Sequence, residues 1–183
     1  MNEERFGGNG DVWVADGYGS NYVHRYTKAG GYTGSINGTE GAAGAFACPH
    51  GIAFIPKPAG AELYIADRSN KRIQVYDGEG KFKRVVGADY LNSPCMFVHR
   101  NGVVYVPELF ARLTIIDEND KLIAHLGENA EAVSTKGWPN HPTGMIHAGK
   151  FNSPHGMAVD AKTGDLYVGE WIVGGRVIKL ART

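Results

Sequence analysis

The chain has 183 residues and no formal net charge, because 19 basic side chains balance 19 acidic ones. Its length is enough for one domain with a well-filled core. The balanced charge, without a run of like charges, argues against a nucleic-acid or membrane surface, and no stretch approaches the ~18 apolar residues of a membrane span. Residues 1–5 lack the basic and apolar regions of a signal peptide, so we expect a cytoplasmic protein by default.

Glycine is frequent, with 26 residues, as expected where turns recur every ~8–12 positions. A glycine-rich stretch at residues 38–47 closes the first group of β-type segments. We expect this group to hold the last three strands of a four-stranded unit. Its predicted strands are residues 12–16, 22–26 and 32–36.

The second group is a complete four-stranded unit. Its final turn, Asp77-Gly78-Glu79-Gly80, has the composition of a hairpin. The predicted strands are residues 50–55, 62–67, 72–77 and 82–86.

The third group contains Asn101-Gly102, a dipeptide that is the strongest short hairpin signal. After an insertion at residues 128–152, a fourth group supplies three more strands, the last at residues 177–180. The strands predicted for the third group are residues 95–98, 103–108, 113–117 and 122–126.

One short element recurs in every group: an aromatic residue, a β-branched residue, a small residue and an acid. Such a repeat is typical of a radial β architecture. The sequence therefore predicts an all-β fold, a single β-propeller domain whose four-stranded blades lie near residues 11–37, 49–87, 94–127 and 153–183. The acids that end the element, which we expect to accept hydrogen bonds from loop backbones, are Asp16, Asp67, Glu108 and Glu170.

The predicted propeller is incomplete, since about three and a half blades are present where propellers have about four to eight. Ring closure removes exposed strand edges. Three arrangements remain open: the chain is a piece of a longer propeller, two copies complete one ring, or the ring is small and atypical. We expect an incomplete propeller completed by self-association, and hence a homo-oligomer.

The same position in three blades carries a side chain that can bind a metal. The tripeptide Pro-His-Gly occurs twice, around His50 and His155, and the matching place in the third blade holds Pro-Cys-Met around Cys95. The first strand of a propeller blade lines the central channel, and imidazole and thiolate are good zinc ligands. Two other roles remain open: a strand-entry turn with the ring bonded to backbone, and a buried small hydrophobe at Cys95.

Two further candidates, Tyr18 and Arg68, each follow the end of an acid-ended strand. At these blade tops both side chains could lean over the mouth of the channel. The alternatives are a loop aromatic packed on its neighbour for Tyr18 and a salt bridge to a blade acid for Arg68.

Segments at residues 14–21, 49–53, 66–74 and 154–157 resemble NHL repeats, and in their order they resemble the peptidyl-α-hydroxyglycine α-amidating lyase propeller. That resemblance implies a six-bladed fold with a central zinc held by three histidines. It also implies cleavage of a C-terminal α-hydroxyglycine into a peptide amide and glyoxylate.

By position, the resemblance makes His50 and His155 two zinc ligands. It makes Tyr18 the general base and Arg68 the arginine that helps to hold the substrate. The third zinc histidine has no equivalent in this chain. Gly156 replaces an acid that binds a structural calcium, so zinc is expected and calcium is not.

Three functions remain open, and the sequence leaves open whether the protein is an enzyme. The first is a metal-dependent lyase or hydrolase acting on a small carboxylate or a peptide end, which Arg68 would clamp. The second is a non-catalytic scaffold that binds a peptide, sugar or protein through exposed aromatics such as Trp138 and Trp171. The third is a truncated propeller module. We expect His141, in the insertion, to be solvent-exposed.

Overall fold

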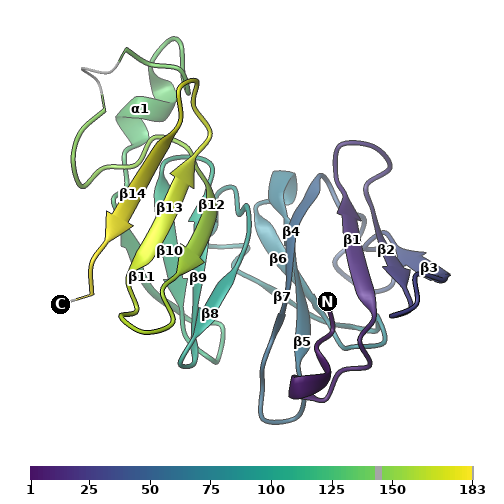
Figure 1. The fold of residues 1–183 in the computed structure, drawn as a ribbon. Coiled ribbons are helices and arrows are strands. Elements are labelled where there is room, and N and C mark those ends of the chain that lie inside the picture. Colours follow the sequence, from purple (N-terminus) through teal and green to yellow (C-terminus); the bar gives the residue numbers. More distant parts are fainter. Residues whose placement is uncertain (143–145, 183) are drawn as a thin grey trace. The chain divides into compact units, whose positions relative to one another are not determined.

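The computed structural model describes residues 1–142 and 146–182, and these residues form four antiparallel sheets (Figure 1). The chain divides into two compact units, Met1–Tyr90 and Leu91–Thr183, which we call the N-terminal and C-terminal units. Each unit holds two sheets. Within the described residues, no helix is long and apolar enough to cross a membrane.

The N-terminal unit contains a three-stranded and a four-stranded sheet (Figure 1). The order within each sheet follows the sequence, so every neighbouring pair is a hairpin. A short 3₁₀ helix, η1 (Glu4–Phe6), precedes the first sheet, and a second, η2 (Arg68–Asn70), follows β5. The strands are β1 (Val12–Asp16), β2 (Tyr22–Tyr26), β3 (Tyr32–Ile36), β4 (Pro49–Ile55), β5 (Glu62–Asp67), β6 (Arg72–Tyr76) and β7 (Phe82–Val86).

The C-terminal unit contains one four-stranded and one three-stranded sheet, again with hairpin order. A short helix, α1 (Ala130–Ser134), lies in the connection between the two sheets. The strands are β8 (Val98–Arg100), β9 (Val103–Glu108), β10 (Arg112–Ile116), β11 (Leu122–Leu126), β12 (Pro154–Val159), β13 (Leu166–Glu170) and β14 (Arg176–Leu180).

The predicted all-β class and incomplete set of blades are confirmed, and so is the strand pattern of each blade. The largest difference is in β8, which begins at Val98 rather than at Cys95, whereas the ends of other predicted strands differ by at most one residue. Before it, Pro94 makes only an isolated bridge to Glu108. Regular pairing with β9 begins only at Val98, which faces Tyr105.

Each unit has its own hydrophobic core. In the N-terminal unit, Trp13 and Val23 of the first sheet pack with Leu63 and Tyr76 of the second. In the C-terminal unit, the core cluster joins the two sheets and the connection between them. It consists of Leu113, Phe151, Met157, Leu166 and Val168.

Three blade acids accept hydrogen bonds from the loop that precedes the first strand of their blade, and the sequence predicts such bonds from loop backbones. Asp67 accepts a hydrogen bond from the backbone N–H of Ala47 at 2.8 Å. Glu108 accepts one from Ser93 at 2.9 Å, and Glu170 accepts one from Asn152 at 2.5 Å. These carboxylates satisfy loop N–H groups that would otherwise need water as an acceptor. The role of the three acids is therefore structural.

An arginine neutralises each of these three acids. Arg72 donates to Asp67 at 2.7 Å and Arg112 donates to Glu108 at 2.8 Å. The third pair is Arg176 with Glu170, at 3.2 Å. Buried carboxylates need such partners because an unpaired buried charge is costly.

The half-buried His125 of β11 predicts a loss of stability in mild acid. Burial and the nearby charge of Arg112 lower the pKa of His125 below its ordinary value of 6.5. As the pH falls below about 6.5, His125 becomes protonated in the unfolded chain before it does in the folded chain. The free energy of unfolding therefore decreases. Urea unfolding at pH 7.5 and 5.5 is expected to show a loss of less than about 1 kcal/mol that His125→Gln removes. An unchanged pH dependence in the variant would contradict this assignment.

Candidate functional site

Tyr18 lies in the turn between β1 and β2, which Asp16 holds together. The carboxylate of Asp16 accepts hydrogen bonds from the backbone and hydroxyl of Ser20, at 2.9 and 2.8 Å, and from the backbone of Gly19 at 3.0 Å. The bonds from Ser20, with that from Gly19, lower the pKa of Asp16. The turn presents Tyr18 with 79% of its surface exposed.

The chain enters β4 through a strained residue, Cys48. Its backbone has a φ of 56°, in the left-handed region that residues other than glycine rarely adopt. Asn21 accepts a hydrogen bond from the Cys48 N–H at 2.9 Å, and the N–H of Arg68 donates to the Cys48 carbonyl at 3.3 Å. Strain of this kind clusters at functional sites, where the surrounding structure maintains it.

Arg68, at the start of η2, bridges these two segments. Its Nη2 atom donates to the Tyr18 hydroxyl oxygen at 3.0 Å and lies 3.1 Å from the Cys48 sulfur. Its guanidinium carbon lies 5.2 Å from the centre of the Tyr18 ring. The His50 and Tyr18 rings meet edge to face, with centroids 5.8 Å apart. The N-terminal unit thus brings together three predicted site residues, Tyr18, His50 and Arg68, which we call the Tyr–His–Arg cluster.

Gly17 allows the Tyr18 turn to reach the entry of β4. A Cβ atom at Gly17 would lie 2.2 Å from the carbonyl oxygen of Pro49, closer than any tolerable contact. Gly17→Ala is therefore expected to displace the Tyr18 turn and to lower the free energy of unfolding by about 1–3 kcal/mol. Urea unfolding and the amide NMR shifts of residues 17–21 measure both effects. Gly31→Ala is the control, since its nearest neighbour is a threonine hydroxyl at 3.3 Å. Equal effects of the two variants would contradict this interpretation.

Both predicted histidine ligands stand on β-bulges of the first strand of their blade. In β4, Pro49 pairs with Asp67 and Ile52 with Ile65, so residues 50–51 face one partner residue. In β12, Pro154 pairs with Glu170 and Gly156 with Gly169, so the intervening His155 faces no partner residue. Each strand therefore has one extra residue directly after the proline. Bulges redirect side chains and are common next to active sites.

Cys95 occupies the same place in the third blade. Pro94 pairs with Glu108 and Val98 with Tyr105, so residues 95–97 face only residues 106–107. The backbone N–H of Cys95 donates to the carbonyl of Pro107 at 2.9 Å, and its side chain is fully buried. The extra residue again follows the proline that pairs with the blade acid. His50, Cys95 and His155 thus each directly follow the proline that pairs with the acid of their blade.

Within the C-terminal unit, Cys95 and His155 lie close together. A ring nitrogen of His155 and the sulfur of Cys95 are within 4.8 Å of each other. Two ligands of one tetrahedral zinc, bound at about 2.1 and 2.3 Å, stand about 3.6 Å apart. A small side-chain adjustment would therefore allow both residues to bind one ion. Cys48 and Cys95 are thiols, with no disulfide.

Sequence reasoning missed the Cys48 thiol, which contacts Arg68. The sequence singles out Cys48 only by its position directly before Pro49, because the equivalent residues before Pro94 and Pro154 are serines. Two expectations about the insertion are wrong. His141 is buried, with Nε2 2.8 Å from the carbonyl oxygen of Ala132. Trp138 is half-buried and donates to the carbonyl of Asn152 at 2.9 Å, whereas Trp171 is 57% exposed as expected.

No model of a known protein family matches the sequence, and no curated protein does. Solved structures do match. A streptogramin B lyase has 16% identity and a TM-score of 0.57, over 94% of this chain and 51% of that one. Virginiamycin B lyase from Staphylococcus aureus, in selenomethionine form, has 14% identity and a TM-score of 0.57, over 93% of this chain and 52% of that one.

A third match is a catalytically inactive histidine-to-alanine variant of the Staphylococcus aureus virginiamycin B lyase with quinupristin. It has 15% identity and a TM-score of 0.60, over 95% of this chain and 53% of that one. The chain spans about half the length of these structures. At these identities the likeness concerns the fold: it is a β-propeller-type scaffold of antiparallel sheets, incomplete in this chain.

Proposed function

We propose that the chain is a propeller module with a lyase-type active site, in which His50, Cys95 and His155 hold a zinc ion. The observation that carries this proposal is the shared inner-strand bulge of the three residues. Equivalent positions of successive blades face one axis in a closed propeller. One thiolate and two imidazoles make a donor set typical of zinc and leave a fourth position open, as catalytic zinc sites require.

The Tyr–His–Arg cluster supplies the protein groups for the chemistry. A zinc ion bound by the proposed ligands would polarise a substrate oxygen. Arg68 would bind the carboxylate of a substrate through its planar guanidinium, by the paired hydrogen bonds that such groups form. Tyr18, oriented by its 3.0 Å hydrogen bond from Arg68, is the proposed general base.

The proposed substrate class is a small carboxylate or a peptide end. Two observations support a lyase: the resemblance of these segments to the amidating lyase, and the lyase names of the structural neighbours. In the proposed reaction Tyr18 accepts the hydroxyl proton of a C-terminal α-hydroxyglycine and the C–N bond breaks. The departing amide nitrogen takes up a proton, so that the products are a peptide amide and glyoxylate.

The test is glyoxylate release from an N-acylated α-hydroxyglycine by the zinc-supplied protein. We expect Tyr18→Phe to lower kcat by about 100-fold or more, since it removes the base, and Arg68→Gln chiefly to raise KM. Tyr32→Phe is the matched control, because Tyr32 is an exposed tyrosine, 62% accessible, on β3. Folded, zinc-loaded protein that releases no glyoxylate would contradict this proposal.

A non-catalytic binding scaffold is the second candidate. The loop between β13 and β14 exposes Trp171 by 57% and Val173 by 85%, an apolar surface suited to a peptide or protein partner. Substrate binding without turnover in the assay above would favour this candidate. Self-association into a homo-oligomer stays a prediction, which the mass of the protein in solution tests.

A further inference from the structure

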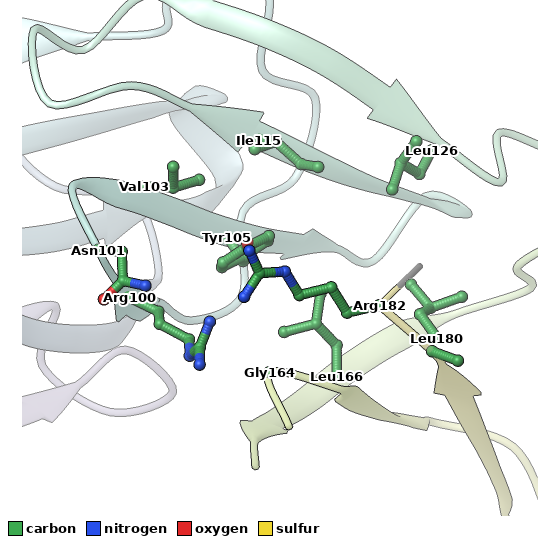
Figure 2. A pocket seen from close by; sticks show the side chains of 11 residues that line it. Arg100, Asn101, Val103, Tyr105, Ile115, Leu126, Gly164, Leu166, Leu180 and Arg182 are labelled. Carbon is green, nitrogen blue, oxygen red and sulfur yellow. The ribbon is translucent and has the colours of Figure 1, made fainter. Parts of the chain in front are cut away.

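The C-terminal unit contains a cavity of about 450 Å³ that none of the proposed site residues lines. Its volume lies in the range of small-molecule sites. Apolar side chains from both sheets of this unit form its walls, as Figure 2 shows. They are Val103 and Tyr105 of β9, Ile115 of β10, Leu126 of β11, Leu166 of β13 and Leu180 of β14.

Two arginines line the same cavity. Arg100 ends β8 and Arg182 follows β14, and in Figure 2 both side chains extend into the space beside Tyr105. Residues far apart in the sequence thus place two positive charges against an apolar wall.

Neither guanidinium has an acidic partner in the part of the chain that the structure describes. Near Arg182, the carboxylate of Asp165 is already engaged. It forms an ion pair with Lys179 at 2.8 Å and accepts the backbone N–H of Arg182 at 3.0 Å. Two cations that face one cavity repel each other and favour an anion between them.

The turn before β13 is shaped to admit both arginines. Gly164 has a φ of +81°, and a Cβ atom there would lie 2.7 Å from Nη1 of Arg100 and 3.2 Å from Cδ of Arg182. Any larger residue at this position would push the arginine side chains aside. The absence of a side chain at Gly164 therefore lets the two arginines approach over the turn.

We infer that this cavity binds a carboxylate with an apolar tail. The two guanidinium groups would hold the carboxylate through charge-assisted hydrogen bonds, and the tail would lie against the leucine and isoleucine side chains. A fully polar anion would leave the apolar wall unused, and an uncharged apolar molecule would leave the two cations uncompensated. The inference is independent of the proposed lyase site, with which the cavity shares no residue.

Octanoate is the probe, because it joins one carboxylate to a linear apolar tail. We expect isotope-labelled protein to show saturable NMR shift changes at residues 100–105 and 164–166 as octanoate is added. Arg100→Gln and Arg182→Gln are each expected to weaken octanoate binding by about tenfold, the effect of losing one charge-assisted hydrogen bond. Lys162→Gln, which removes an exposed positive charge outside the cavity, is the matched control and should leave binding unchanged.

Octanol and acetate separate the contributions of head and tail, and each should bind at least about tenfold more weakly than octanoate. Equal binding of octanol, or unchanged octanoate binding by both arginine variants, would overturn the inference. So would folded protein that shows no saturable octanoate binding. Tighter binding of octyl phosphate than of octanoate would overturn the carboxylate assignment.

Discussion

Replacing Asp67 by alanine is expected to lower the free energy of unfolding by about 3–5 kcal/mol. Asp67 is fully buried at the end of β5. Its carboxylate accepts hydrogen bonds from Arg72 at 2.7 Å, from Gln74 at 3.2 Å and from the backbone of Ala47 at 2.8 Å. Alanine would leave these donors without their acceptor and Arg72 without its counter-charge. Urea unfolding of the two proteins measures the difference.

Asp16 provides the control for this prediction, because it ends β1 as Asp67 ends β5. Asp16 is half-buried, and its carboxylate accepts hydrogen bonds from Gly19 and Ser20 of its own turn. Asp16→Ala should therefore cost no more than about 1–2 kcal/mol, as for loss of a capping residue. A similar loss of unfolding free energy in the two variants would contradict the prediction, because it would show that burial of Asp67 does not determine how much this residue contributes to stability.

Leu113→Ala is expected to destabilise the C-terminal unit by about 2–5 kcal/mol. Leu113 of β10 is fully buried and belongs to the cluster that includes Phe151 and Leu166. Truncation removes apolar surface from this cluster and leaves a cavity that neighbouring strands can close only in part. The free energy of urea unfolding measures the loss.

Leu122→Ala removes the same atoms from an exposed position on the neighbouring strand β11, where the leucine is 40% accessible. This control should change stability by less than about 1 kcal/mol, because much of its side chain already meets water. A Leu113 variant as stable as the Leu122 variant would contradict the description of this core.

The blades could be predicted from the sequence because their signals are local. Strand residues alternate with turn residues at short intervals, and the acid-ended element marks the same strand of each blade. The extent of β8 could not be predicted, since the extra residue after Pro94 depends on how β9 pairs with it. Register is a tertiary property, and a bulge shifts it without a distinctive sequence signal.

Part of the candidate site was predictable for the same reason. Tyr18 and Arg68 follow the ends of equivalent strands, so the blade repeat alone suggests that they lie at one level. The contact between Arg68 and the Cys48 thiol depends on the left-handed backbone at Cys48, which the sequence does not reveal. The cavity beside Arg100 and Arg182 combines residues from six strands and the segments that connect or follow them, and no local pattern joins them.

The amount of metal bound per chain tests the proposed zinc site, by elemental analysis of protein purified without a histidine tag. We expect about one zinc per chain for the three proposed ligands, with strong loss in His50→Ala, Cys95→Ser and His155→Ala. His147→Ala should retain the metal, because His147 is exposed and lies outside the three equivalent positions. Well-folded protein without stoichiometric metal, or equal retention by all four variants, would contradict the assignment of these positions as a metal site.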